Sequence, residues 1–194
     1  MIKLFLLMIL SLSINISAQD AEQRLKDLQN KFEKINDLTV DIVQKSGGAE
    51  VLSGKLSFKK ENKFHLDLKN NLIVSDGNNI WNYNKKENKV IINVVDESDP
   101  SYFSFKTFVY EYPPQCYVSL DEGDIILTPK SDSELNFMNA RLSLNEEDLV
   151  EKVLIKGSGS NIEINFSNYR LNQKLADSKF KFIPPEGSSV IDLR

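Results

Sequence analysis

The chain has 194 residues, of which 41% are hydrophobic and 27% charged, and 28 acids against 24 lysines and arginines give a net charge of −4. This acidic balance excludes a binder of duplex nucleic acid, which needs a basic surface. His65 and Cys116 are the single histidine and the single cysteine. Such a composition argues against an internal disulfide, most zinc sites and a Cys-His or Ser-His relay. It favours binding over catalysis, with no metal or cofactor.

The first eighteen residues have the features of a cleaved secretory signal peptide. Lys3 supplies a positive charge, residues 4–14 are almost wholly apolar, and Ser17 and Ala18 fit a cleavage site. The apolar stretch is shorter than the roughly 20 residues of a membrane-spanning helix, although a membrane anchor is the alternative. We predict cleavage after Ala18, which leaves residues 19–194 as a single domain. Because Cys116 lies far downstream, we expect an exported protein that is released rather than lipid-anchored.

Residues 20–36 predict one amphipathic helix. Leu25, Leu28, Phe32 and Ile35 fall at spacings of three, four and three, which forms one apolar stripe on an otherwise charged helix. We expect this stripe to pack against an apolar surface.

After this helix the apolar residues alternate with polar ones at a period of two, which is typical of half-buried antiparallel strands. Short polar breaks separate the alternating stretches, and Asp76–Gly77 fits a hairpin turn. The pattern predicts about eleven strands, as expected of an all-β sheet or barrel. They are residues 38–42, 52–58, 64–68, 72–75, 79–84, 89–94, 124–128, 140–144, 152–156, 161–166 and 179–183.

The segment 102–112 interrupts the strand pattern with six aromatic residues. Phe105, Phe108 and Tyr112 share one helical face, so we predict a short helix and loop over the sheet. The aromatic content fits core packing and a mobile cover equally well. One long helix cannot cover the whole apolar face of such a sheet. A closed barrel, a second cover from the aromatic segment and an apolar cavity that binds lipid therefore all remain possible.

Five segments, in order, carry a resemblance to a known family: residues 38–44, 54–64, 74–84, 126–129 and 180–187. Together they resemble the periplasmic outer-membrane lipoprotein carrier protein (LolA) family over nearly the whole mature chain. The resemblance implies a mainly β fold, an unclosed antiparallel half-barrel of about eleven strands. Helices form a lid over an apolar cavity in this family, and residues 20–36 and 102–112 would supply lid elements here.

The resemblance also implies a function in the periplasm of a Gram-negative bacterium. Members of the family bind the acyl chains of lipoproteins released by an inner-membrane ABC transporter and pass them to an outer-membrane acceptor. The partners implied are therefore acylated lipoproteins, this transporter and this acceptor, for a monomeric chaperone that is not an enzyme.

Candidate site residues come from the resemblance and from alternation. Lys60 matches a family arginine that holds the lid closed, although a solvated turn lysine is the alternative, and Glu61 replaces the family's proline. Phe64 matches an aromatic residue at the cavity mouth, and a one-residue register error would turn the alternating set to the wrong face. The full predicted cavity set is Leu56, Phe58, Phe64, Leu66, Leu68, Trp81, Phe105 and Phe108.

Three other functions remain compatible with the sequence. A carrier or sensor of free lipid or glycolipid would use the same half-barrel. A secreted hydrolase of lipids or sugars would need a nucleophile and a base, which the single histidine disfavours. A filled β-domain with a structural or adhesive role would have no cavity.

Overall fold

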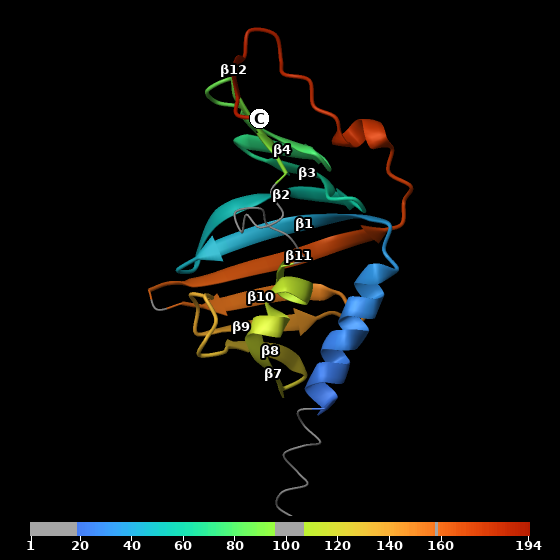
Figure 1. Ribbon diagram of the computed structural model, residues 1–194, viewed down its shortest axis with the longest axis vertical. Coiled ribbons are helices and arrows are strands. Elements are labelled where there is room, and N and C mark those ends of the chain that lie inside the picture. The colour runs from blue at the N-terminus through green and yellow to red at the C-terminus, as the bar shows by residue number, and fades with distance from the viewer. Residues whose placement is uncertain (1–18, 96–106, 158) are drawn as a thin grey trace, which may run out of the picture. The chain divides into compact units, whose positions relative to one another are not determined.

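The computed structural model describes residues 19–95, 107–157 and 159–194 (Figure 1). The predicted signal peptide and the first half of the aromatic segment lie outside these residues. An N-terminal helix (residues 19–33) is followed mainly by strands. They are β1 (Asp37–Ser46), β2 (Ala49–Lys59), β3 (Lys63–Leu68), β4 (Asn71–Asp76), β5 (Asn79–Asn84), β6 (Lys89–Val94), β7 (Cys116–Asp121), β8 (Asp124–Pro129), β9 (Asn139–Leu144), β10 (Val150–Lys156), β11 (Asn161–Leu171) and β12 (Ser189–Asp192). Three short helical turns complete the elements of the described chain: η1 (Thr107–Glu111), η2 (Pro113–Gln115) and η3 (Asp177–Phe180).

These strands form one unclosed sheet in the order β12-β6-β5-β4-β3-β2-β1-β11-β10-β9-β8-β7. Consecutive strands pair antiparallel, as in β1–β2 and β8–β9, whereas β12 pairs in parallel with β6. The predicted class, a mainly β protein with an unclosed sheet, an N-terminal helix and a short helix, is therefore confirmed. No helix in the described parts of the chain is long and apolar enough to cross a membrane.

The chain divides into two compact units. Unit 1 comprises the chain up to Glu33 and Tyr102–Glu163, and unit 2 comprises Lys34–Ser101 and Ile164–Arg194. Unit 1 therefore holds the N-terminal helix, η1, η2 and strands β7–β10. Unit 2 holds strands β1–β6, most of β11, η3 and β12.

The core of unit 1 combines a helical stripe with one face of its strands. Leu25 and Leu28 of the predicted stripe are buried, as are Ile125 and Leu142, which face each other across β8 and β9. The helix ends at residue 33, three residues before the predicted end, and Ile35 is buried in unit 2.

In unit 2 the apolar side chains lie mainly on one face of β1–β3 but on both faces of β4–β6, where Ile80 shares the face of Phe64 and is 2% exposed. On β1–β3 they lie on the face shared by Val40, Leu56 and Leu66, which are direct partners across the strands. On β4–β6 the opposite face carries Val74 and Trp81, again direct partners, beside further buried apolar residues. We call these the Leu56 face and the strap face.

The strap, residues 172–188, is an irregular segment between β11 and β12 that includes η3 (Figure 1). Its short helix η3 lies against β3 and β4. Phe180 is 1% exposed, and the ring of Phe182 lies 5.6 Å from the ring of Tyr83 on β5. The strap thus buries the apolar side chains of the strap face, as a packed helix does in many other sheet proteins.

Three strand assignments differ from the sequence prediction. The predicted strand 179–183 is wrong, because this segment buries alternate aromatic rings against a sheet face instead of pairing at an edge. Its period-two pattern is the same in both cases. Strands β7 and β12 were not predicted. The four residues of β12 are all exposed, so they carry no alternation signal.

Candidate functional site

The register places five of the predicted cavity residues together on the Leu56 face. Phe58 pairs directly with Phe64, Leu56 with Leu66, and Gly54 with Leu68. Since directly paired residues of antiparallel strands share a face, the alternating set has one orientation across β2 and β3. On the neighbouring strand, Leu38, Val40 and Ile42 continue the same apolar surface as partners of β2.

Burial differs along this surface. Leu56 and Leu66 are only 4% and 8% exposed, whereas Phe58, Phe64 and Leu68 remain partly exposed. A Cβ atom built on Gly54 would lie 2.2 Å from the carbonyl oxygen of Asp67 and 2.8 Å from Leu68 Cδ2. Glycine is therefore required for the close approach of β2 and β3, and Leu68 lies over it.

The prediction that Trp81 belongs to the same set is wrong. Leu66 pairs with Ile73 and Phe64 with Ser75, whereas Trp81 pairs with Val74 between them. Trp81 therefore lies on the strap face. The error arose because β5 carries apolar side chains on both faces, so alternation does not decide whether Ile80 or Trp81 continues the Leu56 face.

Unit 1 holds the described part of the predicted aromatic cover. Phe108 is 7% exposed and meets Tyr112 edge to face, with ring centres 5.3 Å apart. The ring of Tyr112 lies 5.4 Å from that of Phe137, in the loop before β9. Phe108 is thus a core residue of unit 1, and Phe105 lies outside the described residues.

Two reciprocal hydrogen bonds join the N-terminal helix to η1. The Gln29 side chain donates to the carbonyl oxygen of Val109 at 2.8 Å, and the Tyr110 hydroxyl donates to the Gln29 carbonyl oxygen at 2.9 Å. Burial, followed by the nearby charge of Glu33, raises the pKa of Tyr110, so its hydroxyl remains a donor at physiological pH. These bonds tie together the two elements that were predicted as lid elements. Sequence analysis missed them because glutamine and tyrosine carry no pattern signal.

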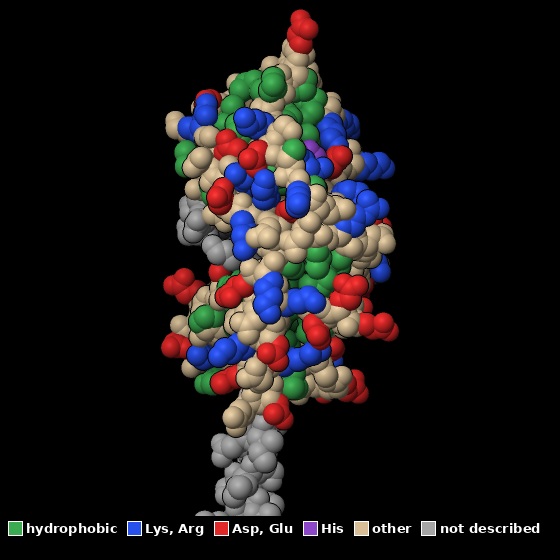
Figure 2. All heavy atoms as spheres, turned by 90° about the vertical axis from the view of Figure 1, so that its right-hand side faces the viewer, with side chains coloured by type: hydrophobic (Ala, Val, Ile, Leu, Met, Phe, Trp, Pro, Cys, Tyr) green, Lys and Arg blue, Asp and Glu red, His purple; other side chains and the backbone are tan. Residues whose placement is uncertain are grey.

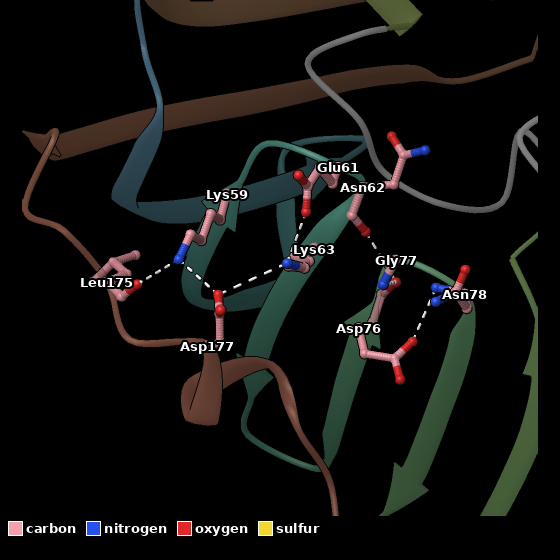
Figure 3. A network of polar contacts seen from close by, with 10 residues as sticks. Lys59, Glu61, Asn62, Lys63, Asp76, Gly77, Asn78, Leu175 and Asp177 are labelled. Carbon is pink, nitrogen blue, oxygen red and sulfur yellow. Dashed lines mark hydrogen bonds and ion pairs between the residues drawn. The ribbon is translucent and has the colours of Figure 1, made fainter.

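Lys60, the predicted latch, begins the β2–β3 turn. Its side chain is exposed, and its backbone N–H donates to the carbonyl oxygen of Asn36 at 3.0 Å. The neighbouring Lys59 reaches the strap, where its Nζ donates to the Leu175 carbonyl oxygen at 2.9 Å and to Asp177 Oδ1 at 2.6 Å (Figure 3). The hydrogen bond from Lys59 and the charges of Lys59 and Lys63 lower the pKa of Asp177. A latch function of Lys60 stays a prediction.

The departure at Glu61 has a clear structural consequence. Glu61 and Asn62 have φ values of 70° and 56°, a left-handed pair that proline could not adopt at the first position. The turn packs on Gly77, where a Cβ atom would lie 2.4 Å from the Glu61 carbonyl oxygen. Ser75 Oγ donates to the Asn62 carbonyl oxygen at 2.9 Å. Gly77 thus allows the β2–β3 turn and the β4–β5 turn to pack closely against each other.

A buried aspartate that sequence analysis missed anchors the strap at the start of β1. Asp37 is 3% exposed, and its carboxylate accepts backbone N–H bonds from Gln173, Lys174 and Leu175 at 2.8, 3.0 and 3.3 Å. Its own carbonyl oxygen accepts from the Asn172 N–H at 2.8 Å. The residue fixes the path of the chain as it leaves β11.

No group of three or more His, Cys, Asp or Glu side chains in the described parts of the chain could hold an ion. His65 lies on the strap face of β3, where it pairs with Val74. The candidate site is the Leu56 face, because its apolar side chains form one surface that stays partly exposed.

Comparison with known proteins supports this reading of the fold. The family model described as outer membrane lipoprotein carrier protein LolA matches residues 33–183. An outer-membrane lipoprotein carrier protein of Azotobacter vinelandii is 28% identical over 90% of each chain. An uncharacterized protein of Methanocaldococcus jannaschii is 26% identical over 89% of this chain, which spans 54% of that longer protein.

A solved structure shares the fold at much lower identity. The crystal structure of an uncharacterized conserved protein from Thermus thermophilus matches with a TM-score of 0.56 at 12% identity. The match covers 91% of this chain and 99% of the other. At this identity the likeness concerns the fold alone.

Proposed function

Because the chain belongs to the LolA family of outer membrane lipoprotein carrier proteins, we propose that it binds the acyl chains of lipoproteins and carries them through the periplasm. The observation that carries this proposal is the Leu56 face. Large apolar side chains on β1–β3 form one surface there, and Phe58, Phe64 and Leu68 keep part of their area accessible.

The physical need for such a surface follows from the cost of exposing acyl chains. Each methylene group transferred from an apolar environment to water costs about 0.8 kcal/mol, so the chains of one lipoprotein cost on the order of tens of kcal/mol. A carrier that covers them removes most of this barrier. Handing over must then proceed from one apolar surface to another, because release into water meets the same cost.

The proposed partners follow from the family. An inner-membrane ABC transporter would deliver the acylated protein, and an outer-membrane acceptor would receive it. The carrier itself needs no nucleotide, since delivery and acceptance supply the direction. We place the protein in the periplasm, exported by the predicted signal peptide of residues 1–18.

The test is to express the full sequence in a Gram-negative host, purify the protein gently from the periplasm and identify bound molecules by mass spectrometry. We expect acylated lipoproteins with the wild type and at least a tenfold loss with Phe64→Glu, which places a charge on the partly exposed apolar surface. Val51→Glu is the matched control, because Val51 is 58% exposed on the same hairpin. Circular dichroism verifies that both variants fold.

The other possible results of this experiment would replace or refute the proposal. Phospholipid without lipoproteins would replace the proposal with a carrier of free lipid. An empty protein that also fails to bind an apolar dye would indicate a filled core and refute both functions. Equal loss of cargo in Phe64→Glu and Val51→Glu would show that the Leu56 face is not the binding surface.

A further inference from the structure

The strap presents two different sets of side chains at alternate positions. Phe180 and Phe182 lie against the sheet, as their burial and the ring contact with Tyr83 show. Lys181 between them is exposed, and Ile183 is 86% exposed, the highest value among the large hydrophobic residues of the described chain. An extended backbone turns alternate side chains in opposite directions, so Lys181 and Ile183 project outward together.

The outward pair sits on a firmly held backbone. Asp37 accepts three consecutive strap N–H groups, Lys59 binds Leu175 and Asp177, and Phe180 is buried. Side chains on a backbone that is already ordered lose little conformational entropy on binding. The exposed isoleucine is therefore presented by a structured segment instead of a loose tail.

Charge distinguishes the unit that carries the strap. The described residues of unit 2 contain fifteen lysines and arginines and ten acids, a net charge of +5, whereas those of unit 1 contain seven and fifteen, a net charge of −8. Figure 2 shows several lysine and arginine side chains, with some acidic ones among them, around the histidine on this side of unit 2. The charges of Lys179, Asp67 and Lys85 act on His65, and of these Lys85 is paired with Asp67 at 2.5 Å.

We propose that the strap side of unit 2 docks on an anionic phospholipid membrane, with Ile183 inserted among the headgroups and the lysines on the lipid phosphates. A peripheral protein binds such a surface by combining basic side chains with a few inserted apolar ones. Asp177 on the same segment is neutralised by Lys59, and Glu186 is the remaining strap acid. This inference does not depend on the proposed cargo.

An aliphatic side chain favours a membrane over an acidic protein as the partner. Lysines alone would suffice for a polyanionic protein surface, and an isoleucine that is 86% exposed would add nothing to ion pairing. Pro184 and Pro185 follow Ile183 and lack backbone N–H groups, so this tip has fewer polar groups to desolvate at an interface.

The test measures co-sedimentation of the purified full chain with vesicles of phosphatidylglycerol and phosphatidylcholine, and with vesicles of phosphatidylcholine alone. We expect binding to the anionic vesicles only, weakened several-fold between 50 and about 300 mM salt as screening increases. Lys181→Glu should weaken binding about 25-fold, because the reversal changes the charge by two and each charge near an anionic surface contributes roughly fivefold. Ile183→Ser should also weaken it about tenfold, through loss of apolar burial.

Matched controls lie in unit 1. Lys26→Glu changes the net charge equally on the N-terminal helix, and Met138→Ser removes an apolar side chain that is 64% exposed. Both should bind like the wild type. Equal loss in the control and strap variants, or no binding to anionic vesicles at low salt, would overturn the proposal. Binding to soluble polyglutamate but not to vesicles would assign the surface to an acidic protein instead.

Lipid uptake by the Leu56 face is a separate source of vesicle binding. Phe64→Glu distinguishes the two, because it alters that face and leaves the strap unchanged. Vesicle binding that is lost in Phe64→Glu but retained in Ile183→Ser would overturn the docking proposal. Retention in Phe64→Glu with loss in Ile183→Ser would support it, whatever the cargo.

Discussion

The two units cover their strands in different ways. In unit 1, the N-terminal helix buries Leu25 and Leu28, and its Gln29 is bonded to η1. In unit 2, the irregular strap buries Phe180 with no regular element longer than the four residues of η3. A helix satisfies its own backbone groups, whereas the strap depends on side chains such as Asp37 and Lys59 to satisfy them.

This difference determines how each unit should respond to mutation. The helix can lose one apolar contact and keep its backbone hydrogen bonds. The strap is held by a few long-range contacts that each fix several residues, so loss of one should release the segment as a whole. The variants below test this contrast, beginning with the largest expected effect.

Phe180→Ala should be the most damaging single change in the strap. Truncation of a fully buried phenylalanine costs about 3–5 kcal/mol in free energy of unfolding, because apolar contact is lost and a cavity forms. Urea unfolding followed by the fluorescence of Trp81, the single tryptophan and a strap-face residue, measures this loss. Ile183→Ala, at a position that is 86% exposed, is the control and should change the stability by less than about 0.5 kcal/mol. Equal effects would refute the assignment of Phe180 as the core of the cover.

Asp37→Ala should have the next largest effect on the free energy of unfolding. The substitution leaves three strap N–H groups without their acceptor, at a cost of about 2–4 kcal/mol. Amide hydrogen exchange should accelerate at residues 173–175 and leave η1 in unit 1 unchanged. Asp27→Ala removes an exposed carboxylate that accepts only from Gln23, and it serves as the control. Unchanged exchange at residues 173–175 would show that the strap is held by packing alone.

Sequence patterns predicted the fold correctly where a regular helix or strand packs against another regular element. Leu25 and Leu28, predicted from their helical spacing, are buried. Leu56 and Leu66, predicted from alternation, are buried as well. The strap escaped prediction because its order comes from Asp37, which lies 136 residues or more before the N–H groups that it binds. No local pattern encodes such a contact.

The candidate site was predictable in part for the same reason. Alternation with the resemblance placed Phe58 and Phe64 on one face, and the register agrees. Trp81 was grouped with them in error, because Ile80 and Trp81 lie on opposite faces of β5 and it is Ile80 that continues the Leu56 face. The strap covers the opposite face of these strands, and such cover is a tertiary property that alternation does not encode.

Gln29→Ala tests the helical cover of unit 1 with a smaller expected effect. It removes the bond to the Val109 carbonyl oxygen and should cost about 1 kcal/mol. Tyr110→Phe removes the reciprocal bond and should cost a similar amount. The measurement is the urea midpoint together with hydrogen exchange in residues 107–112. Gln23→Ala, whose exposed side chain bonds only to Asp27 in the same helix, is the control. Identical exchange in all three variants would show that the two elements do not depend on these bonds.

The smallest expected effect is a pH dependence from His65 beneath the strap. Burial is the main cause that lowers its pKa from the ordinary 6.5, the charge of Lys179 lowers it further, and Asp67 opposes both. The unfolded chain therefore takes up the proton more readily than the folded one. The stabilisation is fully present above about pH 6.5 and is lost as the pH falls through the folded pKa.

The urea midpoint should decrease between pH 7.5 and 5, and His65→Gln should flatten that part of the profile. Because His65 lies under the strap, the Trp81 signal should report the change. A profile that His65→Gln leaves unaltered between pH 7.5 and 5 would refute the assignment to His65. Burial opposes but does not outweigh the N–H groups of Asn78 and Asn79, which lower the pKa of Asp76, so that carboxylate loses its stabilising effect only at more acidic pH.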